Sequence, residues 1–201
     1  EAPLSQIMLN GGNFSDMDKS FMYYVSILKR ILDAVEESGF KIEVHLIVYP
    51  PQNLDLLEAL KGMNVCVAMN TEVYDPELFE EYCPGKVEIA GREHMFNALA
   101  KAIEVLGKGR VFSILVGGLE SVDSLSEGLQ FLANMGVTPV INVLHTDPNT
   151  PLEKFPNPTP DKIKAMGEQL QRIYKSHDFK PFYLNCGRNS IDTEAFKGLF
   201  V

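Results

Sequence analysis

The chain has 201 residues, of which 45% are hydrophobic and 22% charged, and its formal net charge is −9. These values fit one globular domain with a sizeable core. The acidic balance argues against a surface that holds nucleic acid or anionic lipid. No apolar run approaches the roughly 20 residues of a membrane span, and the first residues do not read as a signal peptide. We therefore expect a cytoplasmic protein with a small-molecule partner and no nucleic acid or membrane partner.

Strand-like and helix-like patterns alternate along the chain. Apolar runs predict strands at residues 5–12, 41–49, 65–69, 110–118 and 138–145. Helical periodicity predicts helices at residues 16–39, 54–63, 75–82, 92–107, 121–136 and 159–177. The strands are too apolar to face water on either side, which indicates parallel strands covered by helices. Both an open doubly wound sheet and a part of a (β/α) barrel fit this order of elements.

Polar and small residues follow each predicted strand. The five ends read "NGGN", "YPPQN", "NTEVYD", "GGLES" and "HTDPNT". Ligands bind at the carboxyl ends of the strands in both architectures, so a shared pocket is expected there. No end matches GxGxxG or GxxxxGK[ST], which leaves a dinucleotide site and a P-loop unsupported. No end carries a lysine, which argues against a barrel lyase or aldolase that uses one.

Asn70 and Glu72 stand two residues apart where the third strand stops. Residues i and i+2 of a strand point to the same face, so both side chains are expected at the rim of the pocket. A carboxylate beside an amide is a good receptor for the two hydroxyls of a ribose. The alternative is that Glu72 opens the next loop in solvent and that Asn70 completes a turn.

Four segments, in order, resemble a radical S-adenosylmethionine enzyme of the biotin-synthase-like branch, from that family's second strand onward. They are "IMLNGGN", "MNTEVYDPELFEEYCPGK", "GREHMFNALAKAIEVLGKGRVFSILVGGLES" and "VTPVINVLHTDPNTPLE", and they cover nearly the whole chain. The resemblance implies an α/β fold, a partial parallel (β/α) barrel of about five to six strands. It implies one domain over residues 1–201, with a tail at residues 178–201 that closes or straps the barrel.

The resemblance also implies an activity. Enzymes of this family reductively cleave S-adenosylmethionine to a 5′-deoxyadenosyl radical, which abstracts hydrogen from a substrate that this sequence does not identify. The cofactors implied are S-adenosylmethionine and a [4Fe-4S] cluster, and the partners implied are a small-molecule substrate and an electron donor such as flavodoxin or ferredoxin. The protein supplies position and exclusion of water, while the cofactor supplies the chemistry.

Five residues are expected at the methionine and ribose ends of the cofactor by this resemblance. Gly11 and Gly12 would let the backbone approach the methionine amino group, and Asn70 and Glu72 would take the ribose. Asn13 stands where the family usually has glutamate. The amino group would therefore meet a neutral acceptor, and binding there should be weaker.

The remaining cofactor contacts are expected from later segments. Arg92, or His94 in the same turn, would meet the methionine carboxylate, which a guanidinium can grip with two hydrogen bonds. An exposed first-turn charge is the alternative for Arg92. Gly117 and Gly118 would lie near the adenine.

Three further residues are candidate substrate contacts: His145, Cys186 and Arg188. His145 ends the last predicted strand, and it either touches substrate or hydrogen-bonds the proline-rich loop that follows. Cys186 and Arg188 lie in the tail, which resembles endings that close the pocket in some family members. Asp192, in the same tail, is interpreted as part of a surface strap.

The cysteines depart from the family. The chain has Cys66, Cys83 and Cys186, but no CxxxCxxC motif to ligate a cluster. We therefore expect the cluster loop and the first strand upstream of Glu1, so that this chain alone is inactive. The exposed sheet edge left behind predicts self-association of the fragment. The alternative function is a non-catalytic βα domain that binds a nucleoside-like metabolite or a partner subunit.

Overall fold

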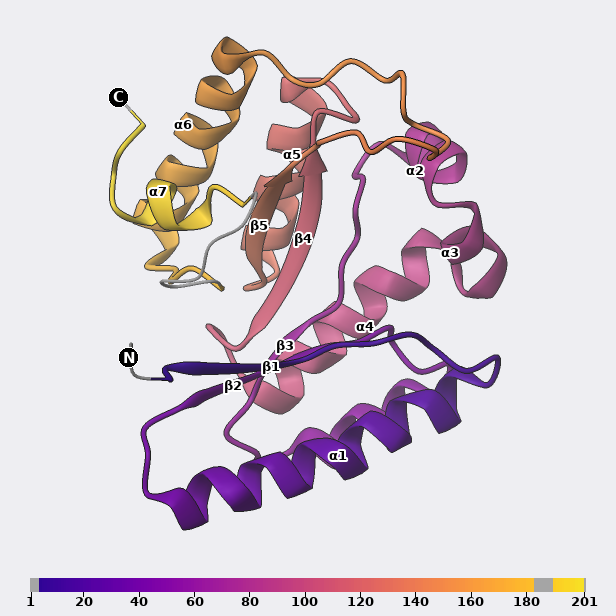
Figure 1. The fold of residues 1–201 in the computed structure, drawn as a ribbon, viewed down its shortest axis with the longest axis vertical. Coiled ribbons are helices and arrows are strands. Elements are labelled where there is room, and N and C mark those ends of the chain that lie inside the picture. The colour runs from indigo at the N-terminus through magenta and orange to yellow at the C-terminus, as the bar shows by residue number, and fades with distance from the viewer. Residues whose placement is uncertain (1–3, 183–189, 201) are drawn as a thin grey trace.

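The computed structural model describes residues 4–182 and 190–200, and within them five strands form one parallel sheet (Figure 1). The strands lie side by side in chain order: β1 (Gln6–Leu9), β2 (Glu43–Ile47), β3 (Cys66–Ala68), β4 (Val111–Gly117) and β5 (Thr138–Val143). Right-handed connections between consecutive neighbours place all the crossover helices on one face. A doubly wound sheet would instead reverse its strand order. The predicted partial (β/α) barrel is confirmed.

Helices follow every strand. They are α1 (Met17–Ser38), the 3₁₀ segment η1 (Leu54–Leu60), α2 (Pro76–Tyr82), α3 (Pro84–Ile89), α4 (Gly91–Leu106), α5 (Val122–Asn134), α6 (Pro160–His177) and α7 (Asp192–Phe196). Asp16 caps α1 by accepting a hydrogen bond from the Lys19 backbone, and Gly39 ends it with φ of 69°. Within the described chain, no helix is long and apolar enough to cross a membrane.

The main core lies between the sheet and its helices. Leu46, Val67 and Leu115 project from β2, β3 and β4 and are fully buried against apolar side chains of α1, α4 and α5. Phe21 and Leu28 contribute the buried stripe of α1, as the helical spacing predicts. This core fixes the strands, and therefore the positions of their carboxyl ends.

A smaller cluster fills the concave face. Ala68, Phe112, Ile114 and Val140 point inward from β3, β4 and β5 and pack on the ring of Phe182. The Gln6 side-chain amide donates to the Phe182 carbonyl at 2.9 Å, which ties the segment after α6 to β1. The chain therefore covers part of its own barrel interior with Phe182.

The tail departs from the sequence prediction at Asp192, which is fully buried rather than on the surface. Its Oδ1 accepts from the Ser190 hydroxyl at 2.5 Å and from the Thr193 amide at 3.0 Å. Asp192 begins α7, and α7 packs on α6, which draws the carboxylate inward with its partners. Whether the tail closes the barrel stays a prediction, since residues 183–189 are outside the described residues.

The two edge strands of the described sheet, β1 and β5, differ in what covers them. Ser190 makes an antiparallel bridge to Asn142, so part of the β5 edge is covered. β1 pairs with β2 on one side and is the other edge strand of the described sheet. An edge strand is a template for pairing with another chain. Self-association of the chain through β1 remains a prediction.

His45 lies on the concave face with its ring 4.5 Å from that of Phe182, and 1% of the residue is exposed. Burial lowers the pKa of this histidine, and the nearby Glu43 carboxylate opposes the shift only in part. The folded pKa lies below the unfolded one, so the unfolded chain binds more protons below about pH 6.5, and stability falls as the pH drops through that window.

We expect His45→Leu to remove this pH dependence. Urea unfolding at pH 7.5 and pH 5.5 should show wild type losing up to about 1 kcal/mol more than the variant on acidification. Equal losses in the two proteins would show that His45 is not charged on unfolding in this range.

Candidate functional site

The carboxyl ends of β1, β2 and β3 surround a small cavity of about 180 Å³, called here the strand-end pocket. It is lined by Asn10, Gly11, Asn13, Ile47, Val48, Tyr49, Asn70, Glu72, Lys86 and Met95. Four of the residues predicted from the sequence, Gly11, Asn13, Asn70 and Glu72, are therefore brought together. The ends of β4 and β5 contribute none of the lining residues, so three of the five strand ends share this pocket.

Asn70 and Glu72 reach the pocket from an irregular segment, because β3 already ends at Ala68. Glu72 has a φ of 64°, which few residues other than glycine adopt. Its amide donates to the Ile114 carbonyl at 2.9 Å, and its carbonyl accepts from the Val116 amide at 2.7 Å. The segment thus stays against β4 after the regular strand stops, and this contact holds the Glu72 side chain at the pocket.

Lys86 is the pocket residue that sequence reasoning missed. Its ammonium lies 2.9 Å from Glu72 Oε1 and donates to the Asn70 carbonyl at 2.6 Å. It comes from α3, a helix that was not predicted, although a proline at its first position is a recognised start signal. A lysine therefore does reach a strand end, but it is held by an ion pair and a hydrogen bond, which suits a positioning role better than a nucleophilic one.

Other polar groups of the pocket could form further hydrogen bonds. The Asn70 Oδ1 atom is buried and has no hydrogen-bond partner in the described chain. Buried acceptors normally have partners, so an orphan at a pocket points to a missing donor. Burial raises the pKa of Tyr49 to about 12, with a smaller contribution from Cys83. The phenol therefore stays protonated. The Tyr49 hydroxyl already donates to the Lys86 carbonyl at 3.3 Å. The pocket therefore offers acceptors on Asn70 and Glu72 beside the ammonium donor of Lys86.

Glu120 holds this part of the site in place. Its two carboxylate oxygens accept from the Tyr74 amide at 2.9 Å and the Asp75 amide at 3.0 Å, and also from the Ser124 hydroxyl at 2.5 Å. Tyr74 and Asp75 directly continue the Asn70 to Glu72 segment. Glu120 therefore clamps the loop after β3 to the beginning of α5. Its contact with Tyr74 joins residues 46 positions apart, so no local sequence pattern predicts it.

The glycines after β1 are explained only in part by ligand approach. A side chain on Gly11 would collide with the hydroxyl of Tyr24, and that hydroxyl donates to the Gly12 carbonyl at 2.5 Å. No atom lies within 4 Å of a Cβ built on Gly12, so the space beside it is open. Gly11 is thus needed by the fold, while Gly12 leaves room for a ligand.

The glycines after β4 are packed by the protein itself. A Cβ on Gly117 would lie 2.7 Å from Ile141 and 2.8 Å from the Met166 sulfur. Gly118 has a φ of 120°, and its Cβ would lie 3.2 Å from the ring of Pro158. Neither glycine lines the strand-end pocket. Their predicted place beside an adenine therefore stays a prediction, and close packing already accounts for both.

Arg92 and His94 lie at the beginning of α4 and not in the wall of the pocket. The Arg92 Nε donates to the Tyr74 carbonyl at 2.9 Å, and its guanidinium lies 4.8 and 4.7 Å from the ring centroids of Tyr74 and Phe96. His94 Nε2 donates to the Pro51 carbonyl at 2.8 Å. Both side chains have partners within the protein. Their contact with the methionine carboxylate stays a prediction.

Of the three predicted substrate contacts, His145 is described by the structure and does not line this pocket. His145 is exposed, with its Nδ1 3.5 Å from Asp147 Oδ2, and it lines a different cavity of about 390 Å³. Cys186 and Arg188 lie outside the described residues. The structure thus describes one of the three, His145, which follows the carboxyl end of β5.

The two described cysteine thiols do not suit a cluster. Burial raises the pKa of the Cys66 thiol to about 11, and burial also raises that of Cys83. Iron–sulfur clusters are held by thiolates. Within the described residues, no three histidine, cysteine or acidic side chains are grouped so that they could hold a metal ion. The described residues therefore do not fit a [4Fe-4S] cluster.

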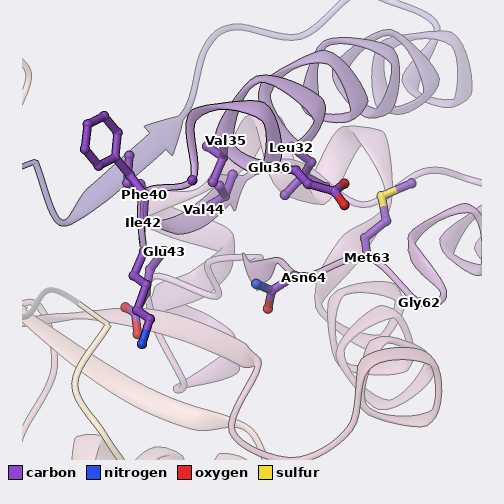
Figure 2. Close-up of a pocket in the computed structure, with 12 residues that line it drawn as sticks. Leu32, Val35, Glu36, Phe40, Ile42, Glu43, Val44, Gly62, Met63 and Asn64 are labelled. Carbon is purple, nitrogen blue, oxygen red and sulfur yellow. The ribbon is translucent and has the colours of Figure 1, made fainter.

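A larger cavity, about 840 Å³, lies at the opposite ends of the strands (Figure 2). Figure 2 shows Leu32, Val35 and Glu36 projecting from the last turns of α1, with Met63 and Asn64 on the other side. Glu43 and Val44 open β2 here, so this is the amino end of that strand. Barrel sites form at the carboxyl ends. The strand-end pocket is therefore the better candidate in spite of its smaller volume.

Known proteins resemble this chain over most of its length. No protein-family model matches it. The sequence is similar to a bacteriochlorophyllide c C-7(1)-hydroxylase of Chlorobaculum limnaeum, with 26% identity over 162 residues, 73% of this chain and 40% of that protein. The fold is similar to the crystal structure of a radical SAM methyltransferase from Sphaerobacter thermophilus, with a TM-score of 0.56 and 17% identity over 77% of this chain and 44% of that chain.

The chain thus spans less than half of the length of each of these proteins. Both relatives are enzymes by name, and the solved one has the same barrel architecture. The five parallel strands in chain order agree with that fold. The fold of this chain is therefore similar to that of a solved radical SAM methyltransferase.

Proposed function

We propose that the chain is the core barrel portion of a radical S-adenosylmethionine enzyme and that its strand-end pocket receives the ribose of the cofactor. The observation that carries the proposal is the orphaned Asn70 Oδ1 beside the Glu72 carboxylate, on one pocket wall. A diol supplies the two donors that these acceptors lack. One Glu72 oxygen is engaged by Lys86, which leaves the other available.

The size of the pocket limits what it holds. About 180 Å³ is smaller than the roughly 300–1,000 Å³ of pockets that enclose drug-sized ligands. It suits a sugar better than a whole cofactor. The open space beside Gly12 would take the methionine portion, as the resemblance implies. When bound at a reduced cluster, the cofactor supplies a carbon radical, whereas this chain's residues bind and orient it.

Binding tests this proposal without any redox chemistry. S-adenosylhomocysteine titrated into the chain by calorimetry should bind with a micromolar to millimolar Kd, and adenosine should bind more tightly than 2′-deoxyadenosine. The deoxy compound lacks one of the hydroxyls that Glu72 and Asn70 would accept from. Equal binding of the two nucleosides, or no binding of either, would refute the ribose assignment.

The proposal includes a small-molecule substrate, an electron donor such as flavodoxin or ferredoxin, and a cytoplasmic location.

The alternative is a βα domain that binds a nucleoside-like metabolite or a partner subunit without redox chemistry. The described cysteine thiols do not form a set of cluster ligands, which favours this alternative for the chain taken alone.

We expect the 201-residue chain to bind S-adenosylhomocysteine but to give no 5′-deoxyadenosine after anaerobic treatment with iron, sulfide and dithionite. The reason is the absence of a CxxxCxxC ligand set in its sequence. Chromatography of the reaction mixture measures the product. Formation of 5′-deoxyadenosine by this chain would show that another set of its side chains holds the cluster.

We expect Lys86→Met to weaken S-adenosylhomocysteine binding about tenfold, because the Glu72 carboxylate and the Asn70 carbonyl both lose their cationic partner. Lys86→Arg keeps the charge and should stay within about threefold of wild type. Lys175→Met, an exposed lysine near the end of α6, is the control and should change nothing. Wild-type affinity in Lys86→Met would show that Glu72 does not need Lys86 to be positioned.

A further inference from the structure

The loop from residue 144 to residue 159 forms an arch over the carboxyl edge of the barrel, called here the arch loop. Figure 1 shows it running from the end of β5 across to α2 and then returning to α6. At α2, the rings of Tyr82 and Phe155 meet edge to face with centroids 5.9 Å apart. On the return, Pro158 packs over Gly118. The arch loop is thus attached at both of its ends and at its furthest point.

The arch loop is also structured internally. The Asn149 amide donates to the Glu153 carboxylate at 3.0 Å, and the Thr150 hydroxyl donates to the Asp147 carbonyl at 2.7 Å. Long loops in compact domains that have no regular structure are commonly functional. A loop held in this way can form one wall of a binding site.

A cavity of about 390 Å³, the arch cavity, lies between the arch loop and the end of α2. It is lined by Glu81, Tyr82, Pro84, Leu144, His145, Thr146, Asp147, Thr150, Pro151 and Leu152. Its volume falls in the range of small-molecule sites, which are mainly apolar with a few placed polar groups. Tyr82, Leu144 and Leu152 are half-buried and supply apolar surface from two separate elements. This composition suits the apolar body of a small ligand.

The charges at the arch cavity restrict the ligand further. Glu81 and Asp147 are carboxylates, and His145 is already beside Asp147 at 3.5 Å. The ten lining residues, all described, include no lysine or arginine. A carboxylate or phosphate on the ligand would meet like charges with no fixed cation to offset them. The lining favours an uncharged or cationic molecule.

The arch cavity adjoins the strand-end pocket. Pro84, at the first position of α3, lines the arch cavity, and Lys86, two residues later, lines the strand-end pocket. Cys83, just before them, is near enough to Lys86 and Glu72 for their charges to act on its pKa. A molecule seated in the arch cavity would therefore lie across Cys83 and α3 from one seated in the strand-end pocket.

We propose that the arch cavity binds the apolar part of an uncharged or cationic substrate beside the cofactor pocket. The identification of this ligand as substrate rests on the proposed function, whereas the binding preference rests on the cavity alone. Two fluorescent probes of the same aromatic skeleton test the preference: neutral N-phenyl-1-naphthylamine and its sulfonated relative 8-anilinonaphthalene-1-sulfonate. Both become bright when they leave water for an apolar site.

The neutral probe should bind the wild-type chain more tightly than the sulfonated one. Leu152→Ser should weaken the neutral probe about fivefold, because the apolar wall is interrupted, and Leu144→Ser provides a second variant at the same wall. The control is Phe40→Ser, at the 840 Å³ cavity at the opposite ends of the strands, where Phe40 is 71% exposed. It should leave the affinity within twofold. Melting curves confirm that each variant is folded.

The charge preference has its own variant. Replacing both Glu81 and Asp147 by their amides should bring the sulfonated probe to within about twofold of the neutral one, because the repulsion is removed. Tighter binding of the sulfonated probe to wild type would overturn the proposal. Loss of binding in Phe40→Ser with none in Leu152→Ser would also overturn it, since the probe would then occupy the other cavity.

Saturating S-adenosylhomocysteine separates this inference from the proposed function. The neutral probe should remain bound, because the two cavities have no lining residue in common. Displacement of the probe would mean that the arch cavity belongs to the cofactor site, which would overturn the proposal. If S-adenosylhomocysteine does not bind to wild type in calorimetry, the proposed function fails, and the probe results still decide whether the arch cavity is an apolar site.

Discussion

Replacing Glu72 by alanine is expected to weaken S-adenosylhomocysteine binding about a hundredfold. The Glu72 oxygen that Lys86 leaves available would accept a hydrogen bond from the ribose, and a bond to a charged group contributes about 1.5–3 kcal/mol. At the upper end of this range, its loss corresponds to roughly two orders of magnitude in Kd. The variant also removes the anionic partner that lies 2.9 Å from the Lys86 ammonium, so the positive charge of Lys86 is no longer balanced in the pocket. Isothermal calorimetry measures the effect.

Two further variants sharpen this result. Glu72→Gln keeps one acceptor and the shape of the side chain, so we expect a loss of about tenfold. Glu77→Ala removes an exposed glutamate from the first turn of α2, five residues away, and should leave binding unchanged. A loss of less than threefold in Glu72→Ala would mean that the carboxylate does not touch the ligand.

Replacing Glu120 by alanine is expected to lower the free energy of unfolding by about 2–4 kcal/mol. Two backbone amides and one hydroxyl donate to this carboxylate, and removal of an acceptor leaves partly buried donors without partners. The loop after β3 should then be less well held. We therefore expect weaker nucleoside binding together with lower stability, measured by urea unfolding and by calorimetry below the transition.

The control for Glu120 comes from the same helix region. Glu127 is exposed on α5, and Glu127→Ala should change stability by no more than about 0.5 kcal/mol. Glu120→Gln places an amide nitrogen where a backbone N–H now points, so it should lose about half of the stabilisation. Equal stabilities of the Glu120 and Glu127 variants would show that the clamp contributes nothing to folding.

The fold was largely predictable, because its periodic patterns are strong. The predicted strands and long helices are confirmed; α1, for example, begins after Asp16 and ends at Gly39. Residues 54–63 were predicted as a helix and form a shorter 3₁₀ segment, Leu54–Leu60. α3 was missed because its six residues bury none of their side chains and leave no apolar stripe to detect. Where packing imposes no period, hydrophobic periodicity cannot detect a helix.

The candidate site was predictable only where it depends on chain order. Parallel strands put Asn70, Glu72 and the residues after β1 at one edge, and the structure places them in one pocket. Lys86 and Glu120 were missed because their contacts join distant parts of the chain. Asp192 was predicted at the surface and is buried, since its partners fold in with it. The hydrogen bonds of Lys86 and Glu120, which join residues 14 and 46 positions apart, leave no local pattern.

The central claim is that the strand-end pocket receives the ribose of S-adenosylmethionine between Asn70 and Glu72. A crystal structure of the chain soaked with S-adenosylhomocysteine tests it most directly. The account predicts ribose hydroxyls at about 2.5–3.0 Å from a Glu72 carboxylate oxygen and from Asn70 Oδ1, with Lys86 still on the other Glu72 oxygen. A nucleoside bound elsewhere, such as in the 840 Å³ cavity at the amino end of β2, would contradict it.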